Sequence, residues 1–173
     1  MNTYKYDIVN TILGSLTIIF TDKGICRLWI WMQDPNCPAI NPDPTKYPVS
    51  HKTCPAPHPQ KLHLEWKQQL ESYFQGKRVI FTIPLDIQEG TAFRKNVWRV
   101  LQKIPYGKTR SYRWVAEQIG TPRAFRAVGQ ANGANPIPIL IPCHRVIQAD
   151  GALGGFSCGT NIKKELLSLE GIL

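Results

Sequence analysis

The sequence predicts an α+β protein in which a small antiparallel sheet with one helix precedes a helical second half. Residues 4–31 alternate apolar and polar side chains over three short runs, the pattern of half-buried strands. Residues 62–74 and 93–104 instead repeat apolar side chains every three or four positions, as helices do. Near residue 120 a short helix, a glycine-containing turn and a basic helix follow one another, which is typical of a helix-turn-helix.

The first half, residues 1–90, is expected to form one small domain. Its elements in chain order are strands at 4–9, 15–20 and 25–31, a helix at 62–74 and a further strand at 79–85. Between the third strand and the helix, eight of the fourteen prolines fall within Pro35–Pro59. Proline removes a backbone donor and disfavours helix in the residue before it, so residues 35–59 are predicted to be an irregular insertion.

The second half, residues 91–173, is expected to form a helical domain. Its elements in chain order are helices at 93–104, 112–119, 123–130 and 163–169, a buried extended segment at 137–141 and a hairpin or wing around 150–155. Ser111 is placed to cap the second helix, because a serine hydroxyl can accept a hydrogen bond from an amide of the first turn. Val97, Trp98 and Leu101 are assigned to the core.

Composition excludes several classes of protein. With 173 residues, 43% apolar and 19% charged, the chain is long enough for one or two domains with a core and too apolar to be disordered. No apolar run approaches the roughly 18–20 residues of a membrane span, and the first residues do not resemble a secretory signal. We therefore expect an intracellular monomer without a membrane partner, cytoplasmic in a prokaryote and nuclear in a eukaryote.

Positive charge is concentrated in the second half. Residues 1–90 hold nine Lys/Arg and eight Asp/Glu, whereas residues 91–173 hold twelve and four, within a net charge of +9. This asymmetry favours a nucleic-acid partner, because cation–phosphate contacts dominate nonspecific affinity. A solubilising basic surface is the alternative. The side chains expected to meet phosphates are Arg94, Lys95, Arg110, Arg113 and Arg123.

Five cysteines make an odd count, which favours a chemically active thiol over a disulfide framework. A second hypothesis is zinc binding, because several potential ligands lie close together in the sequence, although their spacing matches no compact ligand pattern. These residues are Cys37, His51, Cys54, His58 and His63. The alternative is that they are exposed loop residues.

Cys143 is the candidate nucleophile, since it follows the apolar segment 137–141 and is followed at once by His144 and Arg145. A free thiol has a pKa of about 8.5, and a nearby imidazole and guanidinium favour its anion. Adjacent residues on an extended chain point to opposite faces, so His144 needs a turn or a bridging water to reach the sulfur. A buried structural cysteine beside a surface histidine is the alternative.

The segment from Asn135 to Val146, NPIPILIPCHRV, resembles the active-site segment of the O6-alkylguanine-DNA alkyltransferases, also called methylated-DNA–protein-cysteine methyltransferases. The resemblance runs without large gaps from about Thr91 to Gly171 and includes IPYG at 104–107 and RAVG at 126–129. In the first half only Leu13-Gly14 and the strand pattern are similar. The resemblance implies a ribonuclease H-like first domain and a winged helix-turn-helix second domain.

The resemblance also implies a reaction. The helix-turn-helix binds duplex DNA in the minor groove and the damaged guanine is flipped into a pocket, after which a methyl or alkyl group passes from its O6 to Cys143, once and irreversibly. O4 of thymine is left open as a second position of attack. His144 takes the thiol proton through water, Glu170 orients that imidazole, Tyr112 donates a proton to the departing base and Lys163 supports the acceptor site. No metal or cofactor is expected.

The remaining implied roles concern DNA and the flipped base. Arg126 fills the space that the base leaves, and Asn135 ties the helix-turn-helix to the active-site strand. Ser157 lies near O6 of the guanine, and Val146 adjoins the acceptor.

Two residues depart from the family's pattern. Phe125 stands where relatives usually carry a small residue, so it is expected to shift the docking on DNA or to wedge at a base step. Cys158 stands where many relatives carry glycine, and it is expected to narrow the pocket against bulky adducts while leaving methyl acceptable.

Three other functions compete with alkyl transfer. An alkyltransferase-like protein that binds lesions without reacting usually lacks the acceptor cysteine, which is present here as Cys143. A winged-helix transcriptional regulator generally needs a sensor domain beyond the first 90 residues. A cysteine hydrolase is disfavoured because Cys143 and His144 are adjacent in the sequence.

Overall fold

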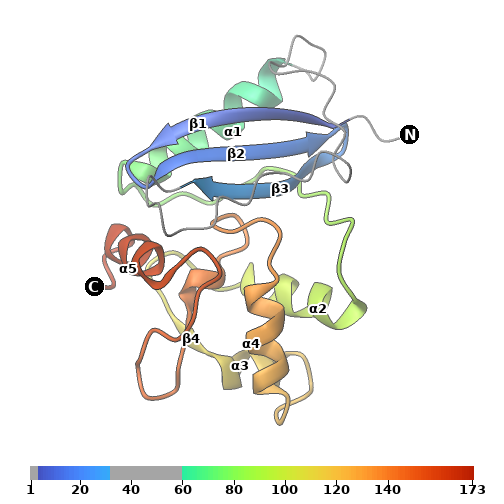
Figure 1. The fold of residues 1–173 in the computed structure, drawn as a ribbon, viewed down its shortest axis with the longest axis vertical. Coiled ribbons are helices and arrows are strands. Elements are labelled where there is room, and N and C mark those ends of the chain that lie inside the picture. The colour runs from blue at the N-terminus through green and yellow to red at the C-terminus, as the bar shows by residue number, and fades with distance from the viewer. Residues whose placement is uncertain (1–3, 32–59) are drawn as a thin grey trace. The chain divides into compact units, whose positions relative to one another are not determined.

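Three antiparallel strands form the sheet of the first half: β1 (Lys5–Thr11), β2 (Gly14–Thr21) and β3 (Gly24–Trp31), in that order (Figure 1). They belong to a computed structural model that describes residues 4–31 and 60–173. The chain divides into two units, Met1–Gln88 and Glu89–Leu173. The strands lie where the alternation of apolar and polar residues predicted them, so the antiparallel sheet is confirmed.

The central strand β2 is buried on both faces, which the alternating pattern did not predict. Every side chain from Leu16 to Thr21 is buried. Thr17 of β2 stands opposite Ile8 of β1 on one side and Trp29 of β3 on the other. Thr17 and Thr21 are therefore buried together with the apolar residues of β2, which belong to the core of this unit.

Helix α1 (Gln60–Phe74) runs alongside the sheet and confirms the helix predicted at 62–74 (Figure 1). Trp66, Leu70 and Tyr73 are its buried side chains, spaced at one helical stripe. At 15 residues α1 is the longest of the described helices. Across residues 4–31 and 60–173, no helix combines the length and the apolarity that crossing a bilayer requires.

The strand predicted at 79–85 is wrong. Only Leu85 pairs, through a single bridge to Ile25. Two hydrogen bonds support this bridge, from Ile25 N to Pro84 O at 2.9 Å and from Asp86 N to Ile25 O at 2.8 Å. Pro84 has no N–H to donate and so cannot extend a ladder, and Ile80 remains 78% exposed.

The second unit contains helices, one 3₁₀ turn and two short strands. In chain order they are α2 (Ala92–Leu101), β4 (Arg110–Ser111), α3 (Tyr112–Gln118), α4 (Phe125–Gly133), the 3₁₀ turn η1 (Cys143–Arg145), β5 (Val146–Ile147) and α5 (Thr160–Leu169). The four predicted helices are confirmed. Helix α4 packs against α2 and α3 (Figure 1). Trp98 is buried as predicted, and its Nε1 donates to Ala131 O at 2.8 Å, which ties α2 to α4.

A short parallel pairing brings α3 next to the segment that carries Cys143. Arg110 of β4 pairs with Val146 of β5, so the start of α3 follows directly from this ladder. Ser111 caps α3 as predicted, because its Oγ accepts from Trp114 N at 3.1 Å. Around 150–155, where a hairpin or wing was predicted, residues 148–152 form a turn closed by a hydrogen bond from Gln148 N to Ala152 O at 2.8 Å, while β5 pairs with β4.

We predict that Gly24→Ala destabilises the first unit by about 2 kcal/mol or more. Gly24 has φ +152, and a Cβ there would lie 2.2 Å from Pro84 O, at the bridge between Leu85 and Ile25. Gly120→Ala is the control, because Gly120 has φ +76 but nothing within 4 Å of its Cβ position, so only backbone strain of roughly 1 kcal/mol is expected. Urea unfolding measures both, and equal losses would contradict the steric explanation.

Candidate active site

Cys143 begins the 3₁₀ turn η1, directly after Pro142. Arg145 N donates to Pro142 O at 3.1 Å and closes the turn. Since a 3₁₀ helix has three residues per turn, Cys143, His144 and Arg145 leave the backbone in different directions. The turn therefore supplies the change of direction that an extended chain would not, and Cys143 is completely buried within it.

The segment before Cys143 is held by the side chain of Asn135. Asn135 Nδ2 donates to Ile141 O at 2.7 Å, and Asn135 Oδ1 accepts from Ile137 N at 3.0 Å. Between them Ile139 is buried with φ 75, a left-handed conformation that costs a β-branched residue about 1–3 kcal/mol. The two hydrogen bonds offset this strain, so the predicted extended segment is a buried, tightly turned loop.

Asn132 is a residue of the site that sequence reasoning missed. Its Nδ2 donates to Cys143 O at 3.2 Å, and its side chain is 2% exposed. Asn132 follows the buried Val128 by four residues on α4, so it continues the apolar stripe of that helix. A polar residue in such a stripe was the signal that could have revealed it.

Glu170 caps α5 and gathers several donors around its buried carboxylate. His144 Nε2 lies 2.8 Å from Oε1. Arg145 donates from Nε to both oxygens, at 3.1 and 2.9 Å, and from Nη2 to Oε1 at 2.9 Å. Gly107 N donates to Oε2 at 3.1 Å, while Arg145 Nη1 donates to Ile104 O at 2.7 Å. The carboxylate thus joins η1, α5 and the turn after α2, and the double contact with Arg145 was not predicted.

These contacts determine the protonation states of Glu170 and His144. Burial raises the pKa of Glu170, but the hydrogen bonds and charges of His144 and Arg145 outweigh it and lower the pKa to about 2. Burial lowers the pKa of His144 below its ordinary value, against the opposing effect of Glu170. An ionised carboxylate can only accept, so His144 carries its proton on Nε2 and Nδ1 is its basic nitrogen.

The thiol of Cys143 is protonated in this environment. Burial raises the pKa of Cys143 to about 12, and the hydrogen bond from Asn135 and the charge of Lys163 lower it only in part. Cys158 acts in the same direction as burial. A thiol held in this state needs a base before it can act as a nucleophile.

Lys163 of α5 is fully buried and contacts the chain that follows the active-site turn. Its Nζ donates to Val146 O at 2.6 Å and to Leu153 O, and lies 6.0 Å from the centre of the Tyr112 ring. Burial lowers the pKa of Lys163 to about 8. Lys163 therefore holds the chain on both sides of the loop that follows β5.

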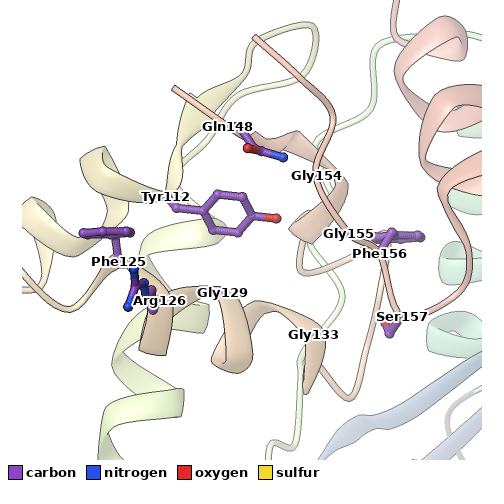
Figure 2. Close-up of a pocket in the computed structure, with 10 residues that line it drawn as sticks. All are labelled: Tyr112, Phe125, Arg126, Gly129, Gly133, Gln148, Gly154, Gly155, Phe156 and Ser157. Carbon is purple, nitrogen blue, oxygen red and sulfur yellow. The ribbon is translucent and has the colours of Figure 1, made fainter. Parts of the chain in front are cut away.

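A cavity of about 470 Å³ opens beside these residues, a size suited to one small ligand. Its lining residues are Tyr112, Phe125, Arg126, Gly129, Gly133, Gln148, Gly154, Gly155, Phe156 and Ser157. Figure 2 shows the Tyr112 ring between α4, which carries Phe125 and Arg126, and the loop that carries Gly154 to Ser157. Burial and the neighbouring Cys143 raise the pKa of Tyr112. Cys143 itself is fully buried and is not among the residues that line the cavity.

The structure brings together some of the predicted site residues and separates others. Ser157 lines the cavity, whereas Cys158 is half-buried, with its Sγ 4.0 Å from Ser157 Oγ. Arg123 lies in the turn before α4, in a second hollow of about 540 Å³ with Thr121 and Pro122. Arg94 is exposed and Lys95 half-exposed on α2, outside the residues that line the first cavity.

No group of three His, Cys, Asp or Glu side chains suited to a metal ion occurs within the part of the chain that the structure describes. Of the residues proposed for zinc, Cys37, His51, Cys54 and His58 lie outside the described residues. His63 lies in α1, and its side chain is likewise outside the description. The zinc hypothesis therefore stays a prediction.

Two family models match consecutive parts of the chain. Residues 92–172 match the DNA-binding domain of 6-O-methylguanine DNA methyltransferase, and residues 4–87 match the ribonuclease-like domain of the same protein. A constitutive methylated-DNA–protein-cysteine methyltransferase of Bacillus subtilis is 42% identical over 168 residues, covering 96% of this chain and 95% of the relative. One from Methanosarcina barkeri is 54% identical over 111 residues, covering 64% and 70%.

Solved structures of methyltransferases match this chain over almost its whole length. A crystal structure of the Mycobacterium tuberculosis O6-methylguanine methyltransferase matches with a TM-score of 0.77 and 39% identity, covering 97% of this chain and 93% of the other. A crystal structure of the same bacterium's OGT in complex with DNA matches with a TM-score of 0.73 and 38% identity, covering 97% and 92%.

We predict that Glu170→Gln lowers the free energy of unfolding by about 3 kcal/mol, because it leaves the buried Arg145 without its anionic partner. The pKa of Glu170 is lower in the folded protein than its ordinary 4.5, so its stabilising effect is complete above about 4.5 and disappears as the pH falls toward 2. The difference in stability between the unaltered chain and Glu170→Gln should therefore shrink over this interval.

Thermal unfolding between pH 7 and pH 2 measures this difference. Glu117→Gln, which changes an exposed carboxylate on α3, is the matched control and should leave stability nearly unaltered. A Glu170→Gln variant as stable as the control at pH 7 would contradict the assignment of Glu170 as the centre of the cluster.

Proposed function

The chain belongs to the methylated-DNA–protein-cysteine methyltransferase family, and on that premise we propose that it repairs DNA by accepting an alkyl group from O6 of guanine on Cys143. The observation that carries the proposal is that one 3₁₀ turn holds Cys143 next to His144, which is paired with Glu170, while Cys143 also neighbours Tyr112 of a cavity large enough for a base. The transfer is stoichiometric, since the thioether formed on Cys143 is not reversed. O4 of thymine is a second, minor position of attack in the same proposal.

The two halves of the chain form domains with different roles in this proposal. Residues 1–90 form a ribonuclease H-like domain, supported by the three-stranded sheet with α1 and by the family model of the first half. Residues 91–173 form a winged helix-turn-helix domain, in which α3 and α4 are the two helices and the loop after β5 takes the place of the wing. The second domain holds both the DNA-binding surface and the acceptor.

Duplex DNA is the proposed partner of a monomeric protein, which acts in the compartment that holds DNA. Helix α4 would enter the minor groove with its first residues, because Phe125 and Arg126 are both exposed there and both border the cavity. Arg126 would occupy the space of the flipped nucleotide, with Phe125 beside it at the base step. Arg94, Lys95 and Arg123 would contact phosphates.

The cavity would receive the flipped guanine. Tyr112 would lie against the base and donate a proton to it as it departs, and Ser157 would lie near O6. Cys158, next to Ser157, would limit the size of the adduct. A cavity of about 470 Å³ is large enough for a purine with a small substituent.

The chemical step is a displacement at the alkyl carbon. A bond forms between Cys143 Sγ and that carbon while the bond from the carbon to O6 breaks. The thiol proton passes through water to Nδ1 of His144, and Glu170 stabilises the resulting imidazolium through Nε2. The electron pair of the broken bond stays on guanine, and a proton from Tyr112 neutralises the resulting negative charge. The high pKa of Cys143 explains why a base is needed.

Three further residues would position the acceptor. Lys163 holds Val146, which follows the active-site turn, and Asn135 holds the loop that precedes Cys143. Because Asn135 comes directly after α4, it would link the DNA-binding helix to the acceptor. Arg145 would act only through Glu170, whose orientation it maintains.

The decisive experiment is to incubate the protein with a DNA duplex that contains O6-methylguanine and then to measure the mass of the intact protein by mass spectrometry. We expect the mass of one methyl group to be added, peptide mapping to place it on Cys143, and Cys143→Ala to gain none. A protein that binds the lesion and gains no mass would instead be a lesion-binding relative without transfer, and the proposal would fail.

The role of Arg126 has its own test. We expect Arg126→Ala to slow methyl transfer from a duplex by about tenfold or more while leaving transfer from free O6-methylguanine nearly unchanged, because Arg126 assists the flipped state. Arg99→Ala, which removes an exposed arginine from α2, is the matched control for loss of positive charge. Equal losses on duplex and free base would count against the role in flipping.

A further inference from the structure

Tyr106 is an aromatic residue beside the Glu170 cluster to which the mechanism above gives no role. It lies in the turn after α2, between Ile104 and Gly107. Both of these neighbours contact the cluster through their backbones. Ile104 O accepts from Arg145 Nη1 at 2.7 Å. Gly107 N donates to Glu170 Oε2 at 3.1 Å. The same turn therefore brings Tyr106 to the ion pair of Arg145 and Glu170.

The ring of Tyr106 lies against the guanidinium of Arg145. The Cζ atom of Arg145 is 5.8 Å from the centre of the ring, a distance at which an aromatic face attracts a cation. The N–H groups of Arg145 are directed at Glu170 and at Ile104 O, so the hydrogen bonds lie in the plane of the guanidinium. The ring acts on the flat face instead. Arg145 is only 6% exposed, whereas Tyr106 is half-buried, so the ring also helps to keep water from that face.

The hydroxyl of Tyr106 makes a second, separate contact. It donates to Leu169 O at 2.9 Å, one residue before Glu170. Burial and the neighbouring Glu170 raise the pKa of Tyr106, so the hydroxyl keeps its proton. The backbone at this end of α5 is also held within the helix, because Glu170 N donates to Leu166 O at 3.1 Å. The hydroxyl thus adds to an existing restraint, whereas the ring acts on a face of Arg145 that its hydrogen bonds do not use.

We propose that Tyr106 is a positioning residue for the methyl transfer, and that its ring holds Arg145 against Glu170 and so keeps the carboxylate directed at His144. This inference rests on the proposed function. Oε1 of Glu170 is shared, since it lies 2.8 Å from His144 Nε2 and 2.9 Å from Arg145 Nη2. A carboxylate follows a guanidinium that binds both of its oxygens, so a shift of Arg145 would draw Oε1 away from the imidazole.

The experiment separates the ring of Tyr106 from its hydroxyl. Tyr106→Leu removes the aromatic face, whereas Tyr106→Phe keeps the face and removes only the hydroxyl. Single-turnover methyl transfer is measured at a saturating concentration of a duplex with O6-methylguanine, and affinity is measured with the unmodified duplex of the same sequence. We expect Tyr106→Leu to slow transfer by roughly fivefold to tenfold and Tyr106→Phe to stay within about twofold, because only the first loses the cation–aromatic contact. Both variants should keep their affinity for the duplex.

Phe81→Leu is the matched control, since it removes a half-buried aromatic ring from the first unit and should leave the rate of transfer within about twofold. Tyr106→Met gives the same comparison should the leucine variant fail to fold. A third variant combines Tyr106→Leu with Glu170→Gln. It should be no slower than Glu170→Gln alone, because the effect of Tyr106 reaches the imidazole through Glu170.

Three results would overturn the inference. The first is a Tyr106→Leu or Tyr106→Met variant that transfers methyl as fast as the unaltered chain, and the second is a Tyr106→Phe variant that is equally slow. The third is a combined variant in which the losses multiply. A loss of duplex affinity in Tyr106→Leu would likewise assign Tyr106 to DNA binding instead of positioning. Absence of transfer by the unaltered chain would contradict the proposed function instead.

Discussion

The buried carboxylate of Glu170 is the group on which the geometry of the second unit depends. It accepts from His144, from Arg145 and from the backbone of Gly107, so it connects the end of α5 to the turn that carries Cys143 and to the turn after α2. A buried anion is tolerated only when donors surround it, and here the donors are the same groups that a proton relay needs. The interaction that stabilises the fold is therefore also the one that orients the proposed base.

The site is closed in the free protein, and this closure has chemical consequences. Burial keeps the Cys143 thiol protonated and the His144 imidazole neutral, so the pair is ready for one proton transfer and protected from bulk solvent. Cys143 is not among the residues that line the cavity, and its backbone carbonyl is held by Asn132. A nucleophile kept protonated and away from solvent suits a protein that can react once.

Local pattern was enough to predict most of the fold. Alternation predicted β1 to β3, helical spacing predicted α1 and α2, and the cap at Ser111 with the break after Ile119 predicted α3 and α4. The strand expected at 79–85 failed because Pro84 lacks a donor and β3 offers only one bridge, and the pairing of β5 with β4 was missed. Both errors concern which segment pairs with which, and a local pattern carries no such information.

The site was predicted as a set of residues rather than as a geometry. Family resemblance named Cys143, His144 and Glu170, and the structure brings His144 and Glu170 to 2.8 Å. The family resemblance could not reveal that the Arg145 side chain contacts Glu170, because this contact depends on the 3₁₀ turn at Cys143–Arg145. Nor could the resemblance reveal Asn132, whose Nδ2 donates to the backbone carbonyl of Cys143.

The central claim is that Glu170 acts on Cys143 through His144, and a double-mutant cycle on the rate of methyl transfer tests it most directly. Single-turnover rates from a duplex with O6-methylguanine would be measured for His144→Ala, Glu170→Gln and the two changes combined. The account predicts that the combined variant is no slower than His144→Ala alone, because Glu170 has no route to the thiol once the imidazole is gone. Losses that multiply would contradict the relay and assign Glu170 a role independent of His144.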